Sequence, residues 1–431
     1  MKKNNLIKLA KKLFPIYRSI TGKGNRETLY QLKRIVPNLK ICKVKSGERF
    51  FDWQVPPEWN IKSGTIKDKD NKVIIDFKKN NLHVVGYSTK IKKKISLKKL
   101  RKHLFYIKKI PKLIPYVTSY YKKFWGFCLS YNEYKKLNNK DYYIEIDSDH
   151  KKGFLNYGEI IIKGKSKKEV FISTYICHPG MVNNEISGPI VSIYLAKWLM
   201  DRNNFYTYRF VFLPETIGSI IYIKKNFKRL IKNVCFGLNI TCVGDNRTYS
   251  FLPTKFKNLY IDRLVRRVLK NLKIKYKEYD WLTRGSDERQ YSSPNVNLPF
   301  VSIMRSKYGT YKEYHTSGDD FKLVTNSGLN KSLELHKETI KTIEQEKYPI
   351  SKIFCEPNMG KRKLYPTKSQ FGKTKFKLRS KMIMNFLTFC DGTFSINDIR
   401  ERLDISNKDI KIITKLLLKH RIIQIQNHPI V

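Results

Sequence analysis

An alternation of short apolar runs and amphipathic segments between residues 140 and 345 constrains the fold of this chain more than any other feature. Four runs have the length and composition of strands buried on both faces: VFISTYI (170–176), YRFVFLP (208–214), VCFGLNITCV (234–243) and FVSIM (300–304). Between the first two, Val191, Leu195 and Leu199 recur at helical spacing behind Pro189, a residue typical of a helix start. This alternation predicts an α/β domain with a mainly parallel sheet that helices cover on both faces.

The residues before this region divide into two parts. Leucines at helical spacing predict that residues 1–42 are helical. From 43 to 113, strand-like runs separated by turn residues such as Pro56-Pro57 predict a small β-rich unit. Its last part, 90–113, is rich in lysine and is expected to be a solvated helix or loop that returns the chain to the main domain.

The composition changes again after residue 345. Residues 346–375 are irregular and are expected to form a linker. Residues 376–431 have the pattern of three helices and a strand, with Ser395 and Asn407 as helix caps. Helix–helix–helix–strand in so short a segment predicts a winged helix.

The chain is strongly basic, with 87 Lys and Arg against 36 Asp and Glu and a formal net charge of +51. Such a chain attracts nucleic acid, anionic lipid or acidic polysaccharide. A binding surface concentrates its charge, whereas these lysines are spread along the whole sequence. Compositional bias is therefore favoured as the main cause, and the many aromatic residues exclude a disordered chain.

Several features bear on the compartment. The seven cysteines are odd in number and lack CxxC spacing, which argues against a disulfide framework and a structural zinc ribbon. The first twenty residues have no apolar core or cleavage site of a secretory signal. No run of about 18 apolar residues offers a membrane span. A cytoplasmic location is expected.

Polar residues that suit metal chemistry follow three of the predicted strands. His178 lies in ICHPGMVNNEISG (176–188), Glu215 in LPETIG (213–218) and His315 in EYHTSGDD (313–320). Loops at the carboxyl ends of parallel strands meet at one edge of the sheet, where ligand sites form. Two histidines and a glutamate there are the ingredients of a catalytic zinc site. Their spacing alone also allows structural histidines held by hydrogen bonds.

Several motifs together resemble a known family. CHPGMVNNEISG, PETIG, TCVGD (241–245), GSDERQY (285–291) and YHTSGDD are similar to the aminopeptidase-like proteins filed as a domain of unknown function, relatives of the co-catalytic zinc exopeptidases. FDWQVPPEWNI and LHVVGYS resemble the β-rich insertion of that family, and CEPNMGKRKLYPT with DGTFS resembles its winged helix. The resemblance, over residues 14–426, implies a zinc-exopeptidase-like mixed sheet covered by helices on both faces. It makes 1–42 and 114–345 one domain, interrupted by the insertion at 43–113.

The resemblance also implies roles for single residues. His178 and His315 fall on metal-ligand positions, Glu215 on the general-base position, and Asn184 where the family carries a metal-binding aspartate. An amide oxygen is a weaker donor than a carboxylate and cannot bridge two zinc ions with its charge. Thr216 and Thr241 replace two further carboxylate ligands of the two-zinc enzymes. We therefore expect one zinc ion, with its oxygen ligand from Asn184, Glu215 or the neighbouring Glu185.

Other residues near the motifs have two interpretations each. Asp287 and Glu288 either orient a ligand histidine or cap a helix. Asp319 either supports the metal site or a substrate or holds the loop after His315 through hydrogen bonds to the backbone, and the second role is favoured. Arg305 either binds a substrate carboxylate or phosphate or is a solvated charge. Cys177 is expected to be a buried apolar residue on the opposite side of the strand from His178.

Two functions of different classes follow. The first is a cytoplasmic, metal-dependent hydrolase of the aminopeptidase type that acts on a peptide or small amide, and family members are associated with surface-polysaccharide synthesis. The second is a catalytically inactive, aminopeptidase-like binding or regulatory protein that contacts nucleic acid or a partner through its winged helix. The intact set of His178, Glu215 and His315 favours the first, and the amide at Asn184 leaves the second open.

Overall fold

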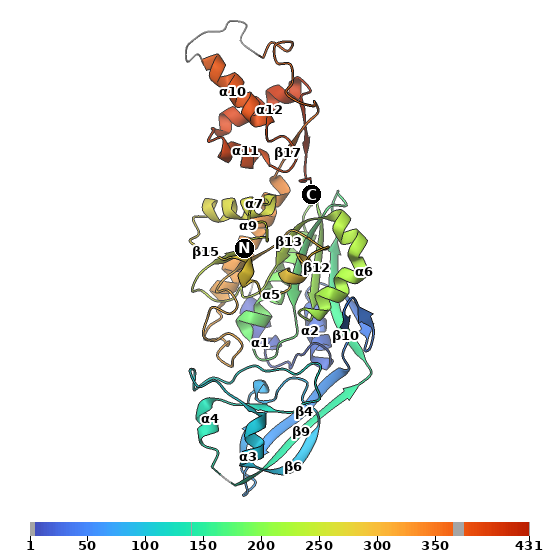
Figure 1. Cartoon of the computed structure of the whole chain (residues 1–431), viewed down its shortest axis with the longest axis vertical. Helices are drawn as coiled ribbons and strands as arrows, with labels where there is room; N and C mark the ends of the chain where they lie inside the picture. Colours follow the sequence, from blue (N-terminus) through green and yellow to red (C-terminus); the bar gives the residue numbers. More distant parts are fainter. Residues whose placement is uncertain (1–4, 139, 365–374, 431) are drawn as a thin grey trace. The chain divides into compact units, whose positions relative to one another are not determined.

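The computed structural model describes residues 5–138, 140–364 and 375–430. The chain forms two compact units (Figure 1). The first comprises Met1–Lys255 and Lys275–His336, and the second comprises Phe256–Ile274 and Lys337–Val431. None of the helices within these described ranges has the length and apolar character needed to cross a membrane.

An eight-stranded mixed sheet forms the centre of the first unit. Its strands follow the order β1 (Lys40–Lys45), β10 (Phe154–Ile162), β12 (Thr207–Leu213), β11 (Glu169–Tyr175), β13 (Val234–Asn239), β16 (Phe300–Met304), β14 (Ser250–Leu252) and β15 (Lys277–Glu278). The four predicted runs supply β11, β12, β13 and β16, which pair in parallel. β10 and β14 add to this centre in antiparallel fashion. The parallel strands are buried on both faces, as their continuous apolar runs require.

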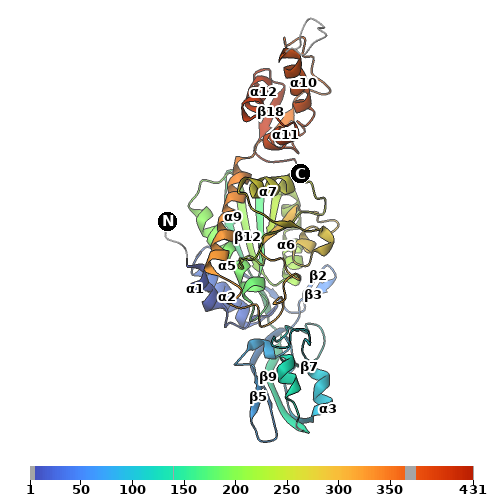
Figure 2. The same cartoon turned by 90° about the vertical axis from the view of Figure 1, so that its left-hand side faces the viewer.

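Helices cover both faces of this sheet (Figures 1 and 2). On one face, α6 packs Ile221 against Phe171 and Val211 of the strands. On the other face, α5 lies against β11 and β12, with α1 and α2 beside it. The helices and short turns of this part are α1 (Leu6–Leu13), α2 (Lys23–Lys33), η3 (Val182–Ile186), α5 (Ser187–Met200), α6 (Ile217–Asn233), η4 (Trp281–Thr283), α8 (Glu288–Tyr291) and α9 (Asn326–Gln345).

A second sheet, of four antiparallel strands, forms the inserted β unit. Its strands follow the order β5 (Val73–Asp76), β4 (Glu58–Lys67), β9 (Asp141–Lys151) and β6 (Ile91–Ser96). The boundary expected at residue 113 is wrong, because β9 lies beyond it and pairs with both β4 and β6. Tyr142, Ile144 and Ile146 alternate in β9 with more exposed residues and fill the core of this sheet.

The lysine-rich stretch 90–113 is the predicted helix or loop only in its later part, because it begins with a strand, β6, before the short helices α3 and η2. β6 is an edge strand, buries Ile95 and exposes Lys92 to Lys94. Charged side chains on an edge strand discourage pairing with another chain. Short elements complete the unit: β2 (Arg49–Phe50), β3 (Trp53–Gln54), η1 (Asn81–His83), α3 (Leu97–Leu100), η2 (Arg101–His103), β7 (Leu104–Phe105), β8 (Phe127–Cys128) and α4 (Tyr131–Lys135).

The second unit contains the predicted winged helix. Its elements are α7 (Tyr260–Asn271), β17 (Tyr348–Ser351), α10 (Lys375–Leu387), α11 (Ile396–Arg402), α12 (Asn407–Lys419) and β18 (Ile423–Gln426). The expected linker 346–375 contains β17, which pairs with β18, so that boundary is wrong as well; residues 365–374 of it lie outside the described residues. Ser395 caps α11 as predicted, whereas α12 is capped by Ser406 rather than by Asn407.

Helix α7 belongs to this second unit through ion pairs, although it lies far from the winged helix in sequence. Nη1 of Arg267 lies 2.8 Å from Asp398, and its Nη2 lies 2.6 Å from Glu346. Glu346 directly follows α9 and Asp398 lies in α11, so one buried guanidinium of α7 joins the end of α9 to α11. The structure therefore extends the predicted unit 376–431 by Phe256–Ile274 and by the residues from Lys337 onward.

Candidate active site

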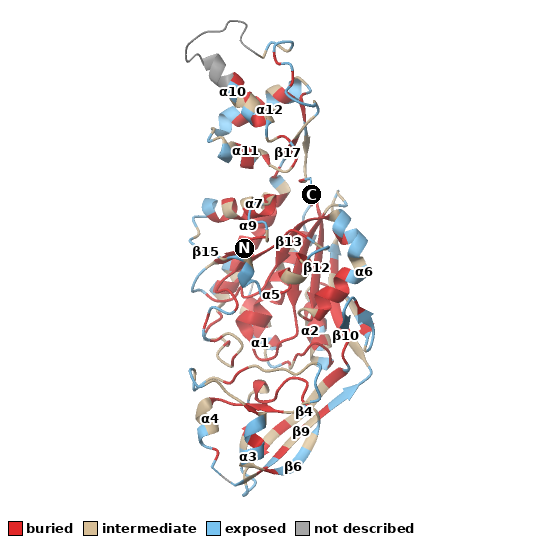
Figure 3. Ribbon diagram, viewed as in Figure 1, coloured by how far each residue is buried: buried red, intermediate tan, exposed pale blue. Residues whose placement is uncertain are grey.

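The central strands of the sheet are buried (Figure 3). His178 lies in the loop after β11, at the carboxyl end of these parallel strands. Its Nδ1 lies 2.9 Å from Oε2 of Glu185, and its carbonyl oxygen accepts a hydrogen bond from Nε of Arg18 at 3.1 Å. Glu185 belongs to η3, a turn of π-helix that leads into α5. When the N–H at Nδ1 donates a hydrogen bond to Glu185, the lone pair of His178 lies on Nε2. That nitrogen can then accept a hydrogen bond or bind a metal ion.

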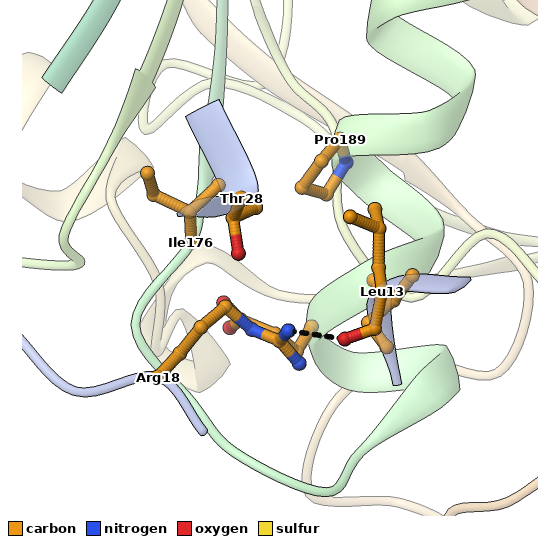
Figure 4. A pocket seen from close by; sticks show the side chains of 7 residues that line it. Leu13, Arg18, Thr28, Ile176 and Pro189 are labelled. Carbon is orange, nitrogen blue, oxygen red and sulfur yellow. Dashed lines mark hydrogen bonds and ion pairs between the residues drawn. The ribbon is translucent and has the colours of Figure 1, made fainter. Parts of the chain in front are cut away.

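Arg18 lies near the carboxylate oxygen of Glu185 that does not face the imidazole, and no sequence pattern pointed to it. Its Nε lies 3.7 Å from Oε1 of Glu185, and its Nη1 donates to the carbonyl of Leu13 at 2.7 Å. Figure 4 shows the guanidinium in a small space between Leu13 and Thr28. Burial raises the pKa of Glu185 and lowers that of Arg18, and the charge of each partner opposes the shift of the other.

We expect Arg18→Met and Glu185→Gln each to lower the free energy of unfolding by about 3–5 kcal/mol, because each leaves one buried charge without its partner. The double variant should lose less free energy of unfolding than the sum of the two single losses. Urea unfolding of the four proteins measures this coupling. Arg202→Met, at an exposed arginine, is the matched control and should change stability by about 0.5 kcal/mol or less. Additive losses would contradict the pairing.

His315 lies in the loop after β16 and adopts a left-handed backbone conformation, with φ 54°. Its imidazole stacks on Tyr314, with the ring centroids 3.9 Å apart. The centroids of His178 and His315 lie 5.4 Å apart. The ring of Tyr116 packs edge-on against both, at 5.1 and 5.3 Å. The structure thus brings together two histidines that are remote in sequence, and it adds a tyrosine that the motifs did not indicate.

Both imidazoles are held neutral. Burial lowers the pKa of His178 to about 3, with a further contribution from the charge of Arg18. Burial, with the neighbouring His178, lowers the pKa of His315 to about 3. A neutral imidazole is the form that binds metal ions. Neither histidine needs to lose a proton first at neutral pH.

Glu215 follows β12 and reaches the same place. Its Oε2 lies 3.6 Å from Nε2 of His178. Its pKa is raised well above the usual range by burial and by the charge of Asp287, while Arg289 opposes the shift. A raised pKa makes a carboxylate a stronger base, and the protonated group can return its proton to a leaving group.

Asn184 lies in η3, close to His178. Its Nδ2 donates to the hydroxyl of Tyr175 at 2.7 Å, and the Tyr175 ring packs edge-on against His178 with centroids 5.3 Å apart. Its Oδ1 is buried and has no hydrogen-bond partner within the described part of the chain. A buried amide oxygen without a partner costs free energy unless a ligand or water meets it.

Thr216 and Thr241 already use their hydroxyl groups. Oγ1 of Thr216 accepts from Nη2 of Arg289 at 2.6 Å, and the residue has a left-handed backbone, with φ 67°. Oγ1 of Thr241 donates to the carbonyl of Asn184 at 3.0 Å and lies 2.6 Å from the Tyr175 hydroxyl. Both threonines therefore build the loops of the site.

Asp287 and Glu288 do not orient either histidine, in contrast to one of their two expected roles. Oδ1 of Asp287 accepts from the backbone of Thr216 at 2.7 Å and from Ser219 at 2.9 Å, so it holds the loop that carries Glu215. Glu288 accepts from Asn239 at 2.7 Å and from Tyr308 at 2.5 Å. These buried hydrogen bonds tie the start of α8 to the loop after β12, to the end of β13 and to the loop after β16.

Asp319 and Arg305 also differ from their expected roles. Asp319 accepts from the backbone nitrogens of Asn183 at 2.5 Å and Asn184 at 2.9 Å, so it holds the loop of Asn184 rather than the loop after His315. Arg305 is buried, donates from Nε to the carbonyl of Asp245 at 2.7 Å and stacks on a tyrosine ring. The guanidinium of Arg305 thus holds the loop that contains Asp245. Both Asp319 and Arg305 are buried in contacts within the protein, so we do not assign either as a substrate ligand.

Cys177 is buried as expected, but it does not point away from the site. Its Sγ accepts a hydrogen bond from the backbone nitrogen of Glu215 at 3.2 Å. The ligand atoms of Cys177, His178 and Glu185 all lie within 4.8 Å of one another. Burial raises the pKa of this thiol well above its usual range, so it stays protonated and is a poor nucleophile.

The mixed sheet, its covering helices and the winged helix define an aminopeptidase-like α/β protein. Residues 7–346 match the domain of unknown function DUF4910, and residues 348–425 match a winged helix-turn-helix domain. The chain belongs to the DUF4910 family.

Related proteins agree with this assignment. A Clostridium acetobutylicum protein, named for polysaccharide biosynthesis and an aminopeptidase-like domain, is 40% identical over 418 residues, which cover 97% of this chain and 95% of that protein. A crystal structure of a candidate peptidase from the same organism has a TM-score of 0.82 at 38% identity and covers 98% of this chain and 96% of that one. BSAP, a zinc aminopeptidase from Bacillus subtilis, has a TM-score of 0.58 at 11% identity over 79% of this chain and 94% of BSAP, which shows a shared fold.

Proposed function

We propose that this chain is a metal-dependent hydrolase of the aminopeptidase type that cleaves a peptide or small amide. The observation that carries the proposal is the convergence of two neutral imidazoles with a carboxyl group: His178 and His315 lie 5.4 Å apart, and Glu215 lies 3.6 Å from His178. A nearby amide oxygen, Oδ1 of Asn184, lacks a partner. Together they supply nitrogen and oxygen donors beside a candidate base.

These donors fit one zinc ion. His178 Nε2, a nitrogen of His315 and Asn184 Oδ1 would hold it, because Glu185 already engages the other nitrogen of His178. Thr216 and Thr241 use their hydroxyls within the protein, so a second ion lacks ligands. A bound zinc ion supplies a Lewis acid that polarises a carbonyl and lowers the pKa of water.

Glu215 is the residue we assign to proton transfer. It takes a proton from the attacking water and delivers it to the leaving nitrogen, so an amide and water become a carboxylic acid and an amine. Its raised pKa suits both steps. The name of the Clostridium relative supports a link to polysaccharide biosynthesis, where the N-acyl group of an amino sugar is an amide that the same chemistry would cleave.

Metal analysis of the purified chain tests the proposal. We expect one zinc per chain at neutral pH, and we expect His315→Ala to lower zinc affinity by at least 10-fold because a ligand nitrogen is lost. His83→Ala is the matched control, since this histidine binds a backbone carbonyl in the inserted unit. A chain that takes up no zinc would contradict the metal centre and would favour an inactive, aminopeptidase-like protein.

A second candidate function is nucleic-acid binding by the winged helix. Helix α12 exposes four lysines, although the exposed Asp409 near its start weakens the positive field: Lys408, Lys411, Lys415 and Lys419. Winged helices place such a helix in the major groove. An affinity for duplex DNA that falls steeply with salt would support this function, and an affinity without salt dependence would not.

A further inference from the structure

A second cavity, of about 610 Å³, lies in the first unit. Four segments meet there: the stretch from the β1–β2 turn to the start of β4, the residues between η1 and β6, the loop between β7 and β8, and the end of β9 with its turn into β10. The volume is in the range of small-molecule sites. We call it the lysine–tyrosine cavity, and its lining residues are Ser46, Gly47, Gln54, Val55, Pro56, Pro57, Tyr87, Thr89, Ser119, Tyr120, Tyr121, Lys122, Lys123, His150, Lys151 and Lys152.

The charge of this lining has one sign. It contains four lysines and a histidine, and no aspartate or glutamate. Lys151 pairs with Asp149 at 3.4 Å. Lys122, Lys123 and Lys152 are exposed and form no ion pair with any described residue. Unpaired ammonium groups around a concave site attract an anionic ligand and can donate charge-assisted hydrogen bonds to it.

The uncharged part of the lining suits a ligand with both apolar and hydroxyl surfaces. Tyr87 and Tyr120 meet edge to face, with centroids 5.2 Å apart, and Pro56 and Pro57 add further carbon surface. Tyr121 is 58% exposed. Serine, threonine and glutamine side chains offer donors and acceptors between these surfaces. Sugar rings present C–H faces and a rim of hydroxyl groups, and they match this mixture.

The cavity is close to the candidate active site. The hydroxyl of Tyr120, which lines the cavity, lies 2.8 Å from the hydroxyl of Tyr116. Tyr116 in turn packs edge-on against His178 and His315. One pair of tyrosines therefore separates the cavity from the two imidazoles.

We propose that the lysine–tyrosine cavity binds the carboxylated sugar residues of an acidic oligosaccharide. The lysines contact the carboxylates, and the accessible rings of Pro57, Tyr120 and Tyr121 contact the ring faces. The inference deepens the proposed function, because it names an acidic glycan as the substrate class, but binding itself requires no catalysis.

Single-stranded nucleic acid is a second kind of polyanion that a basic cavity attracts. Its binding sites offer flat, accessible aromatic faces on which successive bases stack. Here Tyr87 is buried, its hydroxyl donates to the carbonyl of Pro57 at 3.2 Å, and Tyr120 meets it edge to face. Tyr121 alone among the lining tyrosines is freely exposed, so successive bases find no stacking platform. The geometry favours the sugar ligand.

Calorimetric titration with tetragalacturonate, an oligosaccharide with a carboxylate on each ring, tests the proposal. We expect it to bind the full chain, and we expect the double variant Lys122→Ala/Lys123→Ala to raise its Kd at least tenfold. The double variant Lys78→Ala/Lys79→Ala removes the same charge from exposed positions outside the cavity and should change the Kd less than twofold. The neutral maltotetraose should not bind measurably.

Binding should be the same in Glu215→Gln, so a failure of the hydrolase proposal would leave this result intact. Equal binding of maltotetraose would overturn the charge recognition. Tighter binding of a ten-residue oligothymidylate, lost in Lys122→Ala/Lys123→Ala, would identify a nucleic-acid site instead. Absence of tetragalacturonate binding, or equal loss in both double variants, would overturn the proposal.

Discussion

Glu215→Gln is expected to lower the rate of amide hydrolysis by about 10²- to 10⁴-fold, the usual contribution of a general base. Glutamine has nearly the same shape as glutamate but cannot take a proton from water. The side chain lies 3.6 Å from His178 Nε2, and its loop is held by Asp287, so the substitution should leave the loop in place. Steady-state kinetics on an N-acyl amino sugar or a peptide amide measure the loss.

Zinc content separates the role of Glu215 as a base from a role as ligand. If Glu215 is the base, Glu215→Gln should bind zinc within a few-fold of the unchanged chain, because His178, His315 and Asn184 remain. A loss of both zinc and activity would make Glu215 the oxygen ligand, an alternative that the sequence also allows. Full activity in Glu215→Gln would place the base elsewhere.

Asn184→Asp is expected to raise zinc affinity by about 10- to 100-fold. Changing an outer-shell partner alone shifts metal affinity by that amount, and a charged oxygen in place of the unpaired amide Oδ1 acts directly on the cation. Amidase activity should rise with it as long as Glu215 is intact, and Asn184→Asp/Glu215→Gln should bind zinc without turnover. Competition with a chelator of known affinity measures the binding.

Asn184→Asp should lower the stability of the metal-free protein, even though it strengthens zinc binding. Asn184 is buried and donates to Tyr175, so an aspartate there loses a hydrogen bond and buries a charge. With a chelator present, Asn184→Asp should therefore unfold at lower urea concentration than the unchanged chain, and zinc should reverse the order. Unchanged zinc affinity would mean that residue 184 does not face the metal, with Glu185 the next candidate.

Local pattern predicted the central strands. The runs that became β11, β12, β13 and β16 are continuously apolar, and such runs are stable only where both faces of a strand are buried. The same reasoning missed β9, although Tyr142, Ile144 and Ile146 alternate as a strand should, because period-two alternation does not say which sheet a strand joins. Lysine content misdirected the prediction for 90–113, since an edge strand also tolerates lysine.

The candidate site also combines features that the sequence predicted with contacts that it did not. The sequence by itself determined that His178, Glu215 and His315 each follow a buried strand of one sheet, and the carboxyl ends of parallel strands lie at one edge of a sheet. The tertiary structure alone decided that Arg18 meets Glu185, that Asp319 holds the loop of Asn184, and that the tyrosines at 116 and 120 stand between the imidazoles and a basic cavity. Periodicity and capping record interactions between residues a few positions apart. These contacts join residues that the path of the chain brings together from remote positions, and no local pattern encodes them.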